Sequence, residues 1–385
     1  MPQLRSTRSF RSMAPRFRTI NISMEDERQI EEFISTLLER HTPGSLSELS
    51  IRFTQMRDRI DRPPLAFDYI LTHDPSQQEL FAGLVRDLVA FRINNVLLRW
   101  DTLTFSTRLV ELRIQQVTLG YDDAIIPFLR ALSSASNLRD LEIVSVSTIY
   151  NPVTHIQPLS PPIKLPALRF LFMKDLYLNT LERLLSAIAP GPYRSTLFLS
   201  LGNLDINFLD GEPPDDEPEE FEETSYLCKI LKHTEIDTLM ISGLLDGGWL
   251  TDSELVNILK AVPTLKTLKL DTWIFGDELC NDLTRTKNAR APGGDRPLPA
   301  LQNLHLTAVD IRSRKFFKDM VSSYPLKRFI LGGQVLIDGV SGWKPLQEDS
   351  TVVQWLRSNM LDLDLRLVEK DYRPPEFHSS GWKLW

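Results

Sequence analysis

The stretch Leu265-Lys266-Thr267-Leu268-Lys269-Leu270 has the form Leu-x-x-Leu-x-Leu and decides how the rest of the chain is interpreted. Side chains of a β-strand alternate between two faces, so positions four and six of this motif point one way and positions three, five and seven the other. The residues before it, Asp252 to Val262, have the apolar spacing of a helix. One strand and one helix cannot bury their apolar side alone, so the motif predicts neighbouring copies of itself.

Copies of the motif occur along nearly the whole chain. Further copies start at Phe17, Leu46, Ile93, Leu109, Leu138, Leu168, Ile236, Leu301 and Leu326, and weaker ones at Arg194 and Met360. Several starts lie 25 to 30 residues apart. A strand repeated at this period predicts an α/β solenoid over residues 17–370, with parallel strands on its concave face and helices or loops on its convex face.

The segments between the motifs support this interpretation, because many have apolar residues at i, i+3, i+4 and i+7. Helices are expected at Ser76 to Ala90, Asp122 to Ala135, Thr180 to Ala189, Thr251 to Val262 and Arg312 to Ser323. The Thr-Asp-Ser cluster at Thr251 suits an N-cap. The 16-residue step from Ile93 to Leu109 is too short for a helix and predicts only a turn.

Composition restricts the class of protein. A chain of 385 residues would normally fold as two or three compact domains, but the core of a solenoid grows with each repeat. No apolar run reaches the ~20 residues of a membrane-spanning helix. Two cysteines, Cys228 and Cys280, are too few for a disulfide framework and indicate a reducing compartment. We therefore expect an intracellular protein, cytoplasmic or nuclear, without a membrane partner.

Charge is concentrated in one insertion and at the N-terminus. Asp210 to Glu223 contains nine acidic residues and no Lys or Arg; without it, 44 basic residues face 42 acidic ones and the net charge is +2. Its prolines and charges predict a disordered, solvated insertion, or alternatively a docking strip for a basic partner. Residues 1–16 are basic. Met1 to Arg18 has five arginines and no acidic residue, a composition that resembles a mitochondrial transit peptide; the alternative is that Arg5 to Met13 is the remainder of a helix from an earlier repeat.

The repeats resemble those of leucine-rich-repeat proteins. The phrases Ala14 to Ile20 (APRFRTI), Thr42 to Ile51 (TPGSLSELSI) and Arg373 to Phe377 (RPPEF) are similar to the fungal F-box/leucine-rich-repeat proteins. In that family an F-box binds the adaptor of a cullin-based ubiquitin ligase and the repeats select the target. The resemblance implies such a role here, although residues 1–16 are too short and too basic to be an F-box.

The repeats depart from the family pattern at position nine. Where the family has Asn or Cys, this chain has Val117, Val146, Leu176, Trp273 and Val309. The turn backbone must then find other hydrogen-bond partners, so we expect an irregular horseshoe.

Chemical motifs are scarce. None of the six histidines has Cys or carboxylate neighbours at zinc-ligand spacing, and His305 has no local triad partner. The pairs Gly247-Gly248, Gly293-Gly294 and Gly332-Gly333 lack the Lys-Ser/Thr of a phosphate loop, so we expect them in turns. The sequence predicts no metal site, no cofactor and no enzyme activity.

The candidate site is therefore the concave face, at positions three, five and seven of the strands. The early strands offer Glu48, Arg52, Glu111, Arg113, Asp140 and Glu142, and the later ones Lys269, Asp271, Asn303, His305 and Arg328. Between them lie Phe170, Phe172, Phe198 and Met240. Large apolar side chains on an open sheet face mark a contact surface, so we predict that these four bind a protein partner. The alternatives are a different strand register, or a cover over these residues formed by a loop such as 151–166 or by the acidic insertion.

The tail, residues 371–385, carries Trp382 and Trp385. We favour a role as a cap on the last repeat over a free peptide motif. The overall prediction is a non-catalytic protein-interaction module, with target recognition in a cullin ligase as the implied process. The alternatives are a repeat scaffold unrelated to ubiquitin and a nucleic-acid-associated protein. The latter has only the basic N-terminus in its favour, because the concave face is mixed in charge.

Overall fold

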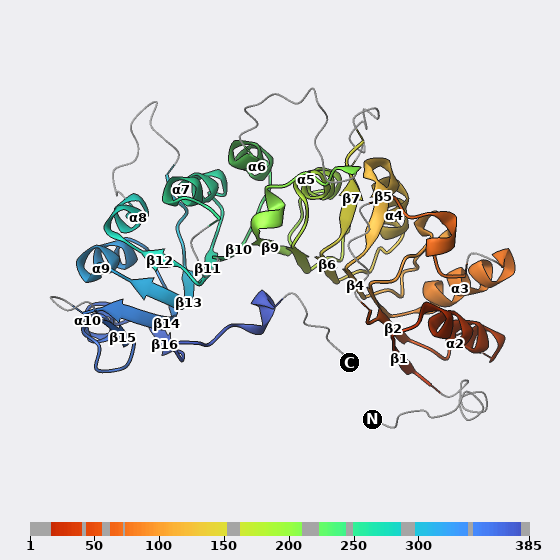
Figure 1. Ribbon diagram of the computed structural model, residues 1–385, viewed down its shortest axis with the longest axis horizontal. Helices are drawn as coiled ribbons and strands as arrows, with labels where there is room; N and C mark the ends of the chain where they lie inside the picture. The colour runs from red at the N-terminus through yellow and green to blue at the C-terminus, as the bar shows by residue number, and fades with distance from the viewer. Residues whose placement is uncertain are drawn as a thin grey trace. The chain divides into compact units, whose positions relative to one another are not determined.

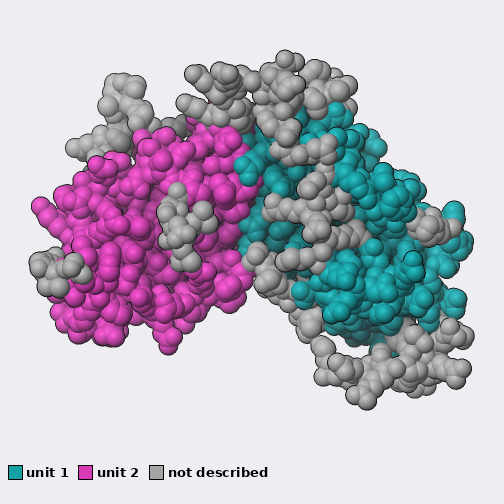
Figure 2. Space-filling view, viewed as in Figure 1, with its two compact units in different colours: residues 1–193, 205–219, 382–385 teal, residues 194–204, 220–381 magenta. Residues whose placement is uncertain are grey.

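The computed structural model describes residues 17–40, 44–55, 62–71, 74–151, 162–209, 223–243, 249–285, 297–337 and 342–378. The chain forms two compact units (Figure 2): unit 1 comprises residues 1–193, 205–219 and 382–385, and unit 2 comprises 194–204 and 220–381. The basic segment 1–16 and, apart from Glu223, the predicted acidic insertion lie outside the described residues.

Unit 1 is built on a parallel sheet whose strands follow the order of the chain. The strands are β1 (Thr19–Met24), β2 (Glu48–Phe53), β3 (Ala90–Asn94), β4 (Glu111–Gln115), β6 (Asp140–Val144) and β8 (Phe170–Lys174). Its helices are α2 (Glu27–Arg40), α3 (Pro75–Asp87), α4 (Ile125–Ser133) and α5 (Leu178–Ala187). β5 (Thr118–Tyr121) and β7 (Ser147–Ile149) form a separate parallel pair. The helices lie along one side of the main strands (Figure 1).

Unit 2 repeats the same arrangement. Its parallel strands are β9 (Arg194–Leu199), β10 (Thr238–Ser242), β11 (Thr267–Asp271), β13 (Asn303–Ile311) and β14 (Arg328–Leu336). β12 (Ile274–Phe275) pairs with β13, and β16 (Asp364–Leu367) and the antiparallel β15 (Trp343–Pro345) pair with β14. Its helices are α6 (Glu223–Leu231), α7 (Asp252–Ala261), α8 (Asp277–Asp282), α9 (Arg314–Ser322) and α10 (Thr351–Asn359). Both units are therefore α/β structures with mostly parallel sheets, as predicted.

The strand registers confirm most of the predicted motifs. Position four of one strand pairs with position four of the next, as in Leu239 with Leu268 and Leu268 with Leu304. Residues at positions four and six are buried almost throughout, which places the core between the sheet and the helices.

Two predicted motif starts are wrong. The register pairs Phe91 with Leu49 and with Leu112, so the third motif starts at Leu88 and not at Ile93. Leu365 pairs with Phe329, which moves the last start from Met360 to Asp362. In both places the chain is rich enough in apolar residues to satisfy the motif in two registers, and strand pairing decides between them.

Each of the five predicted helices is present, with ends that differ by a few residues. α7 begins with a reciprocal capping box: the Glu254 amide donates to Thr251 Oγ1 (3.3 Å) and the Thr251 amide donates to Glu254 Oε2 (2.7 Å). Between β3 and β4 the chain makes a short 3-10 turn, Trp100–Thr102, rather than a helix.

Several strands are followed by the same type of turn, which supplies hydrogen-bond partners for the backbone where the Asn or Cys of the family pattern is missing. Position eight adopts a left-handed conformation at Asn95, Gln116, Ser145, Asp175, Thr272 and Ala308. At Asn95, Gln116, Ser145 and Thr272 the backbone N–H donates to the position-seven carbonyl of the next repeat, as from Gln116 to Val144 (2.9 Å) and from Thr272 to Thr307 (2.9 Å). The turn is therefore hydrogen-bonded through the backbone. The apolar residues at position nine, such as Val117 and Val309, are buried in the core.

A buried polar network holds the connections of unit 1 together beside α5. Thr148 Oγ1 donates to Asp122 Oδ1 (2.6 Å), and Asn179 Nδ2 donates to the same carboxylate oxygen (2.9 Å). Asn207 joins by donating to the Thr148 carbonyl (2.9 Å). Asp122, Thr148 and Asn179 are at most 6% exposed. The network therefore fixes the backbone that leads into the acidic insertion.

Candidate protein-binding faces

The sheet face that carries positions three, five and seven is called the odd face below. Parallel in-register pairing aligns these positions into rows that run across the strands. The position-five row of unit 1 contains Asn21, Ser50, Arg92, Arg113, Glu142 and Phe172. That of unit 2 contains Phe198, Met240, Lys269, His305, Ile330 and Arg366. The predicted candidate residues thus lie on the odd face of one unit or the other.

Charged side chains on the odd face of unit 1 are held in cross-strand ion pairs. Arg92 Nε lies 2.6 Å from Glu111 Oε1, and Arg113 Nη1 lies 2.9 Å from Glu142 Oε2. Arg113 is only 5% exposed. Burial lowers the pKa of its guanidinium, and the charge of Glu142 opposes that shift. The pair therefore holds both side chains in place, because removing either member of a largely buried ion pair is costly.

Phe170 and Phe172 stand on β8 next to these charges. Their rings are stacked, with centroids 6.2 Å apart and an interplanar angle of 9°. In the register they pair with Asp140 and Glu142. Both side chains are partly exposed, whereas Leu171 and Met173, on the opposite face of the same strand, are buried. Unit 1 thus presents an apolar pair beside a fixed pattern of charges.

Phe198 and Met240 belong to unit 2, and their predicted exposure is wrong. They are 3% and 1% exposed. The segment after β16, Val368–His378, which we call the strap, lies on the odd face of unit 2 and contacts Phe198 and Lys269, the residues on either side of Met240 in the row. Phe377 packs edge-on against Phe198, with centroids 5.5 Å apart and an interplanar angle of 71°. A segment thus packs on Phe198 in unit 2, as one alternative from the sequence allowed, but it is the strap and not one of the two segments that the sequence suggested.

The strap makes further side-chain contacts with β11. Glu376 Oε1 lies 2.6 Å from Lys269 Nζ, and Arg373 Nε lies 3.9 Å from Asp271 Oδ2. Burial alone would raise the pKa of Glu376, but the hydrogen bond and charge of Lys269 outweigh it and the pKa is lowered. Pro374, between the two contacts, is buried.

Gly332 provides the crossing point for the strap at the other end of the sheet. A Cβ atom at this position would lie 2.5 Å from Val368 Cγ2 and 3.1 Å from the Glu369 carbonyl oxygen. Only a residue without a side chain allows this approach. Gly332 and Gly333 lie within β14, so the prediction that this pair forms a turn is wrong. The other two glycine pairs lie outside the described residues.

We predicted that the tail, residues 371–385, caps the last repeat. The part of the tail that the structure describes lies elsewhere. Residues 371–378 contact β9 and β11 on the odd face, as the Phe198 and Lys269 contacts show. Trp382 and Trp385 lie outside the described residues.

His305 lies beside the strap in the same row as Lys269. Burial lowers the pKa of its imidazole to about 4; the charge of Lys269 adds to this shift and that of Glu376 opposes it. The ring is therefore neutral at pH 7 and carries no charge that could bind an anion.

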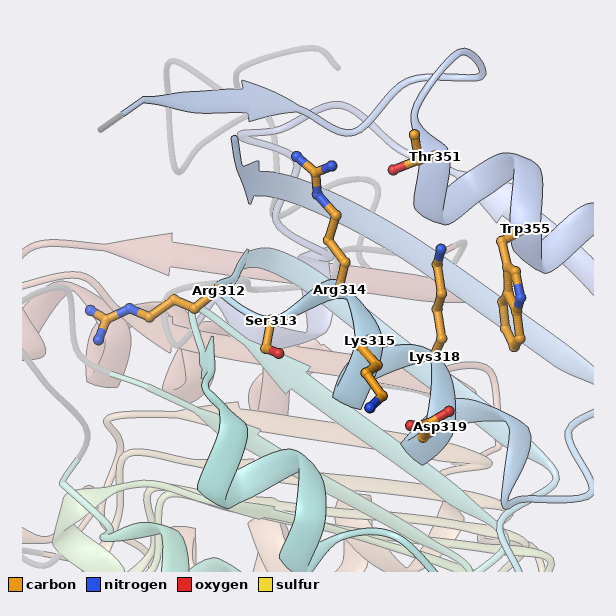
Figure 3. A pocket seen from close by; sticks show the side chains of 8 residues that line it. All are labelled: Arg312, Ser313, Arg314, Lys315, Lys318, Asp319, Thr351 and Trp355. Carbon is orange, nitrogen blue, oxygen red and sulfur yellow. The ribbon is translucent and has the colours of Figure 1, made fainter. Parts of the chain in front are cut away.

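A basic pocket of about 650 Å³ lies between α9 and α10 in unit 2 (Figure 3). It is lined by Arg312, Ser313, Arg314, Lys315, Lys318, Asp319, Thr351 and Trp355. Two of its cations are engaged with the protein: Arg314 Nη2 donates to the Leu336 carbonyl (2.8 Å), and Lys318 Nζ lies 5.6 Å from the Trp355 ring centroid. These contacts pack α9 against its neighbours, and we assign no ligand to the pocket.

Other chemistry is sparse in the parts of the chain that are described. They contain no group of three or more His, Cys, Asp and Glu side chains placed to hold a metal ion. None of their helices combines the length and apolar character needed to cross a membrane. Cys228 and Cys280 are unpaired and buried, and burial raises the pKa of both thiols, that of Cys280 to about 12.

Comparison with known proteins does not identify a family. No family model matches the chain, and no curated protein matches it. Among solved structures, a chain of the TLR13–ssRNA13 complex is similar at 15% identity and a TM-score of 0.34, over 87% of this chain and 43% of that one. A chain of the Rad7–Elc1 complex in yeast is similar at 14% identity and a TM-score of 0.31, over 86% and 81% of the two chains. This chain thus spans less than half the length of the TLR13 chain. At these TM-scores the similarities support no conclusion about this chain. The description of the chain as a series of repeats therefore rests on its own strands and their register.

Proposed function

We propose that the chain is a leucine-rich-repeat solenoid, an irregular horseshoe, that acts without catalysis by binding a protein ligand on the odd face of unit 1. The observation that supports this proposal is the stacked pair Phe170 and Phe172, left partly exposed beside the Arg113–Glu142 ion pair. Aromatic side chains on a rigid surface supply most of the binding energy of many interfaces. The ion pairs next to them supply charge specificity at little cost in ordering, because they are already fixed.

The test is affinity capture with the intact chain as bait, compared with the double variant Phe170→Ser/Phe172→Ser. We expect the variant to lose its specific partner, with a fall in affinity of at least about 30-fold if the two rings contribute ~2 kcal/mol. Phe67→Ser is the matched control, because Phe67 is an exposed phenylalanine (65%) of the same unit, in a 3-10 turn rather than in the sheet.

Unchanged capture by the double variant, with an unchanged thermal unfolding curve, would contradict the proposal. A large loss of thermal stability would instead show that the two rings belong to the core.

The process served by this binding is a finer proposal, supported only by the sequence resemblance to fungal F-box/leucine-rich-repeat proteins. In this proposal the repeats recognise a target for a cullin-type ubiquitin ligase. Recovery of the cullin adaptor from a fungal lysate, dependent on the intact chain, would support it. If the partner that requires Phe170 and Phe172 is recovered without the adaptor, the chain is better described as a repeat scaffold unrelated to ubiquitin.

A nucleic-acid ligand has less support. Such ligands need a continuous basic surface, whereas the odd face of unit 1 alternates Arg92 and Arg113 with Glu111 and Glu142. Capture that falls steeply with salt concentration would favour this alternative.

A further inference from the structure

Side chains, more than backbone pairing, attach the strap to the sheet. The Val368 amide donates to the Leu331 carbonyl (3.0 Å), in continuation of β16. Further along, the amides of Tyr372, Phe377 and His378 donate to carbonyls of Glu369, Pro374 and Pro375, all within the strap itself. The strap therefore lies on the sheet in the way a bound peptide lies on a receptor.

The surface beneath the strap has a defined chemistry. Phe198, Met240 and Lys269 follow one another in the position-five row of β9, β10 and β11. Phe198 and Lys269 are thus two strands apart, about 10 Å at the usual spacing. Two adjacent strap residues meet them: Phe377 contacts Phe198, and Glu376 contacts Lys269. The surface therefore matches a carboxylate followed by an aromatic ring.

We propose that the odd face of unit 2 is a binding groove for a peptide segment in which an acidic residue is followed directly by an aromatic one. The strap is the internal occupant of this groove, and a protein partner with the same Glu-Phe type of pair displaces it. The inference rests on the proposed function in so far as both assign ligand binding to the sheets, but it concerns a different unit and different residues.

Tethering gives the strap an advantage over any external peptide. A segment joined to its site by a short linker acts at an effective concentration in the millimolar range. A partner must therefore bind more tightly than the strap or act when the strap is weakened. Its half-exposed ion pair favours exchange, since Glu376 is 37% exposed and such pairs contribute little stability.

The test uses the full chain and a fluorescent peptide with the sequence of residues 371–378, Asp-Tyr-Arg-Pro-Pro-Glu-Phe-His. The variant Glu376→Ala/Phe377→Ala frees the groove, and Tyr372→Ala, at an exposed strap residue (40%), is the matched control. By fluorescence anisotropy we expect the double variant to bind the peptide at least tenfold more tightly than the intact chain or the control, because internal competition is removed. Replacing Glu by Lys in the peptide should abolish binding, and Lys269→Glu, added to the double variant, should restore it.

Equal affinity for the intact chain and the double variant would overturn the proposal, and so would absence of binding by a double variant with an unchanged thermal unfolding curve. If the double variant unfolds, hydrogen exchange on the intact chain decides. Excess peptide should accelerate exchange at the amides of Phe377 and His378 and leave β11 unchanged, and no acceleration would overturn the proposal.

The variant Phe170→Ser/Phe172→Ser separates this inference from the proposed function. Combined with the strap substitutions, it should bind the peptide normally. Loss of partner capture with retained peptide binding then bears only on the proposed binding face of unit 1. Retained partner capture with loss of peptide binding bears only on the proposed groove of unit 2.

Discussion

The odd faces of the two units use one backbone design for different surfaces. In both, parallel strands align positions three, five and seven into rows. In unit 1 the position-five row passes from Arg92 and Arg113 to Glu142 and Phe172, and its charges are satisfied within the sheet. In unit 2 the row begins with Phe198 and Met240, which are both buried, and a segment of the same chain packs on Phe198. The comparison shows that an apolar residue at an odd position does not by itself mark an open contact surface. A segment from far away in the sequence can pack on it and cover it.

We expect the largest loss of stability when the ion pair between Arg113 and Glu142 in unit 1 is broken. Arg113→Met removes the guanidinium that lies 2.9 Å from the carboxylate of Glu142, whose side chain is 19% exposed. Breaking a largely buried pair costs about 3–5 kcal/mol, and we expect a loss of this size in chemical denaturation. The double variant Arg113→Met/Glu142→Gln should recover most of the loss.

The matched pair in unit 2 is Lys266 with Asp237, at 2.6 Å, in which the lysine side chain is 59% exposed. Lys266→Ala should cost less than about 1 kcal/mol, since exposed pairs contribute little. Equal losses of unfolding free energy in Arg113→Met and Lys266→Ala would mean that the Arg113–Glu142 pair of unit 1 is not a buried ion pair.

A smaller effect is expected where the strap crosses β14. Gly332→Ala places a Cβ against Val368 and Glu369 and should destabilise unit 2 by about 1–3 kcal/mol, the usual cost of overpacking. Gly202→Ala is the control in the same unit, because a Cβ there meets nothing within 4 Å. Both are read by thermal unfolding. Similar curves for the two variants would show that the strap does not pass over Gly332.

Acidification should weaken unit 2 through His305. Its pKa is about 4 in the folded chain, whereas an unfolded histidine titrates near 6.5. Between these values the unfolded chain binds a proton that the folded chain excludes, so stability falls as the pH falls from about 6.5 to 4. The lowered pKa of Glu376 acts in the same direction, because its contribution is lost as the pH falls through the folded pKa.

His305→Gln should flatten this part of the pH profile, measured as the unfolding temperature at pH 7 and pH 5. His233→Gln, at an exposed position of the same unit, is the control. A profile unchanged by His305→Gln would show that the folded chain does not keep this imidazole from binding a proton.

The smallest expected effect concerns the thiols. The two cysteines of the chain, Cys228 and Cys280, both belong to unit 2, and both are buried with raised pKa values. A thiol reagent should react with the native protein far more slowly than with the unfolded chain. The reaction then reports the opening of unit 2 separately from that of unit 1. Rapid native reaction would contradict the burial of both side chains.

Periodicity carried most of the fold prediction. Leucine spacing identified the strands because positions four and six must be buried, and capping residues such as Thr251 marked helix starts. Periodicity was insufficient around residues 88–98 and 360–367, where apolar residues satisfy two registers and only pairing with the neighbouring strand decides.

The candidate site was predicted less well, for a physical reason. Placement of Phe198 and Met240 on the odd face follows from local alternation, but Phe198 is covered by Phe377, more than 170 residues away. One local signal existed: Gly332 stands at position seven of β14, where the strands before it carry Asp271 and Thr307, and a missing side chain permits a close crossing.

Hydroxyl-radical footprinting of the intact chain tests the contrast between the two odd faces most directly. The rates of oxidation of Phe170 and Phe172 are compared with those of Phe198 and Met240, in the wild type and in Glu376→Ala/Phe377→Ala. We predict that the first pair is oxidised in both proteins, and that Phe198 and Met240 are protected until the strap contacts are removed. Rapid oxidation of Met240 in the wild type, or protection of all four residues in both proteins, would contradict the account.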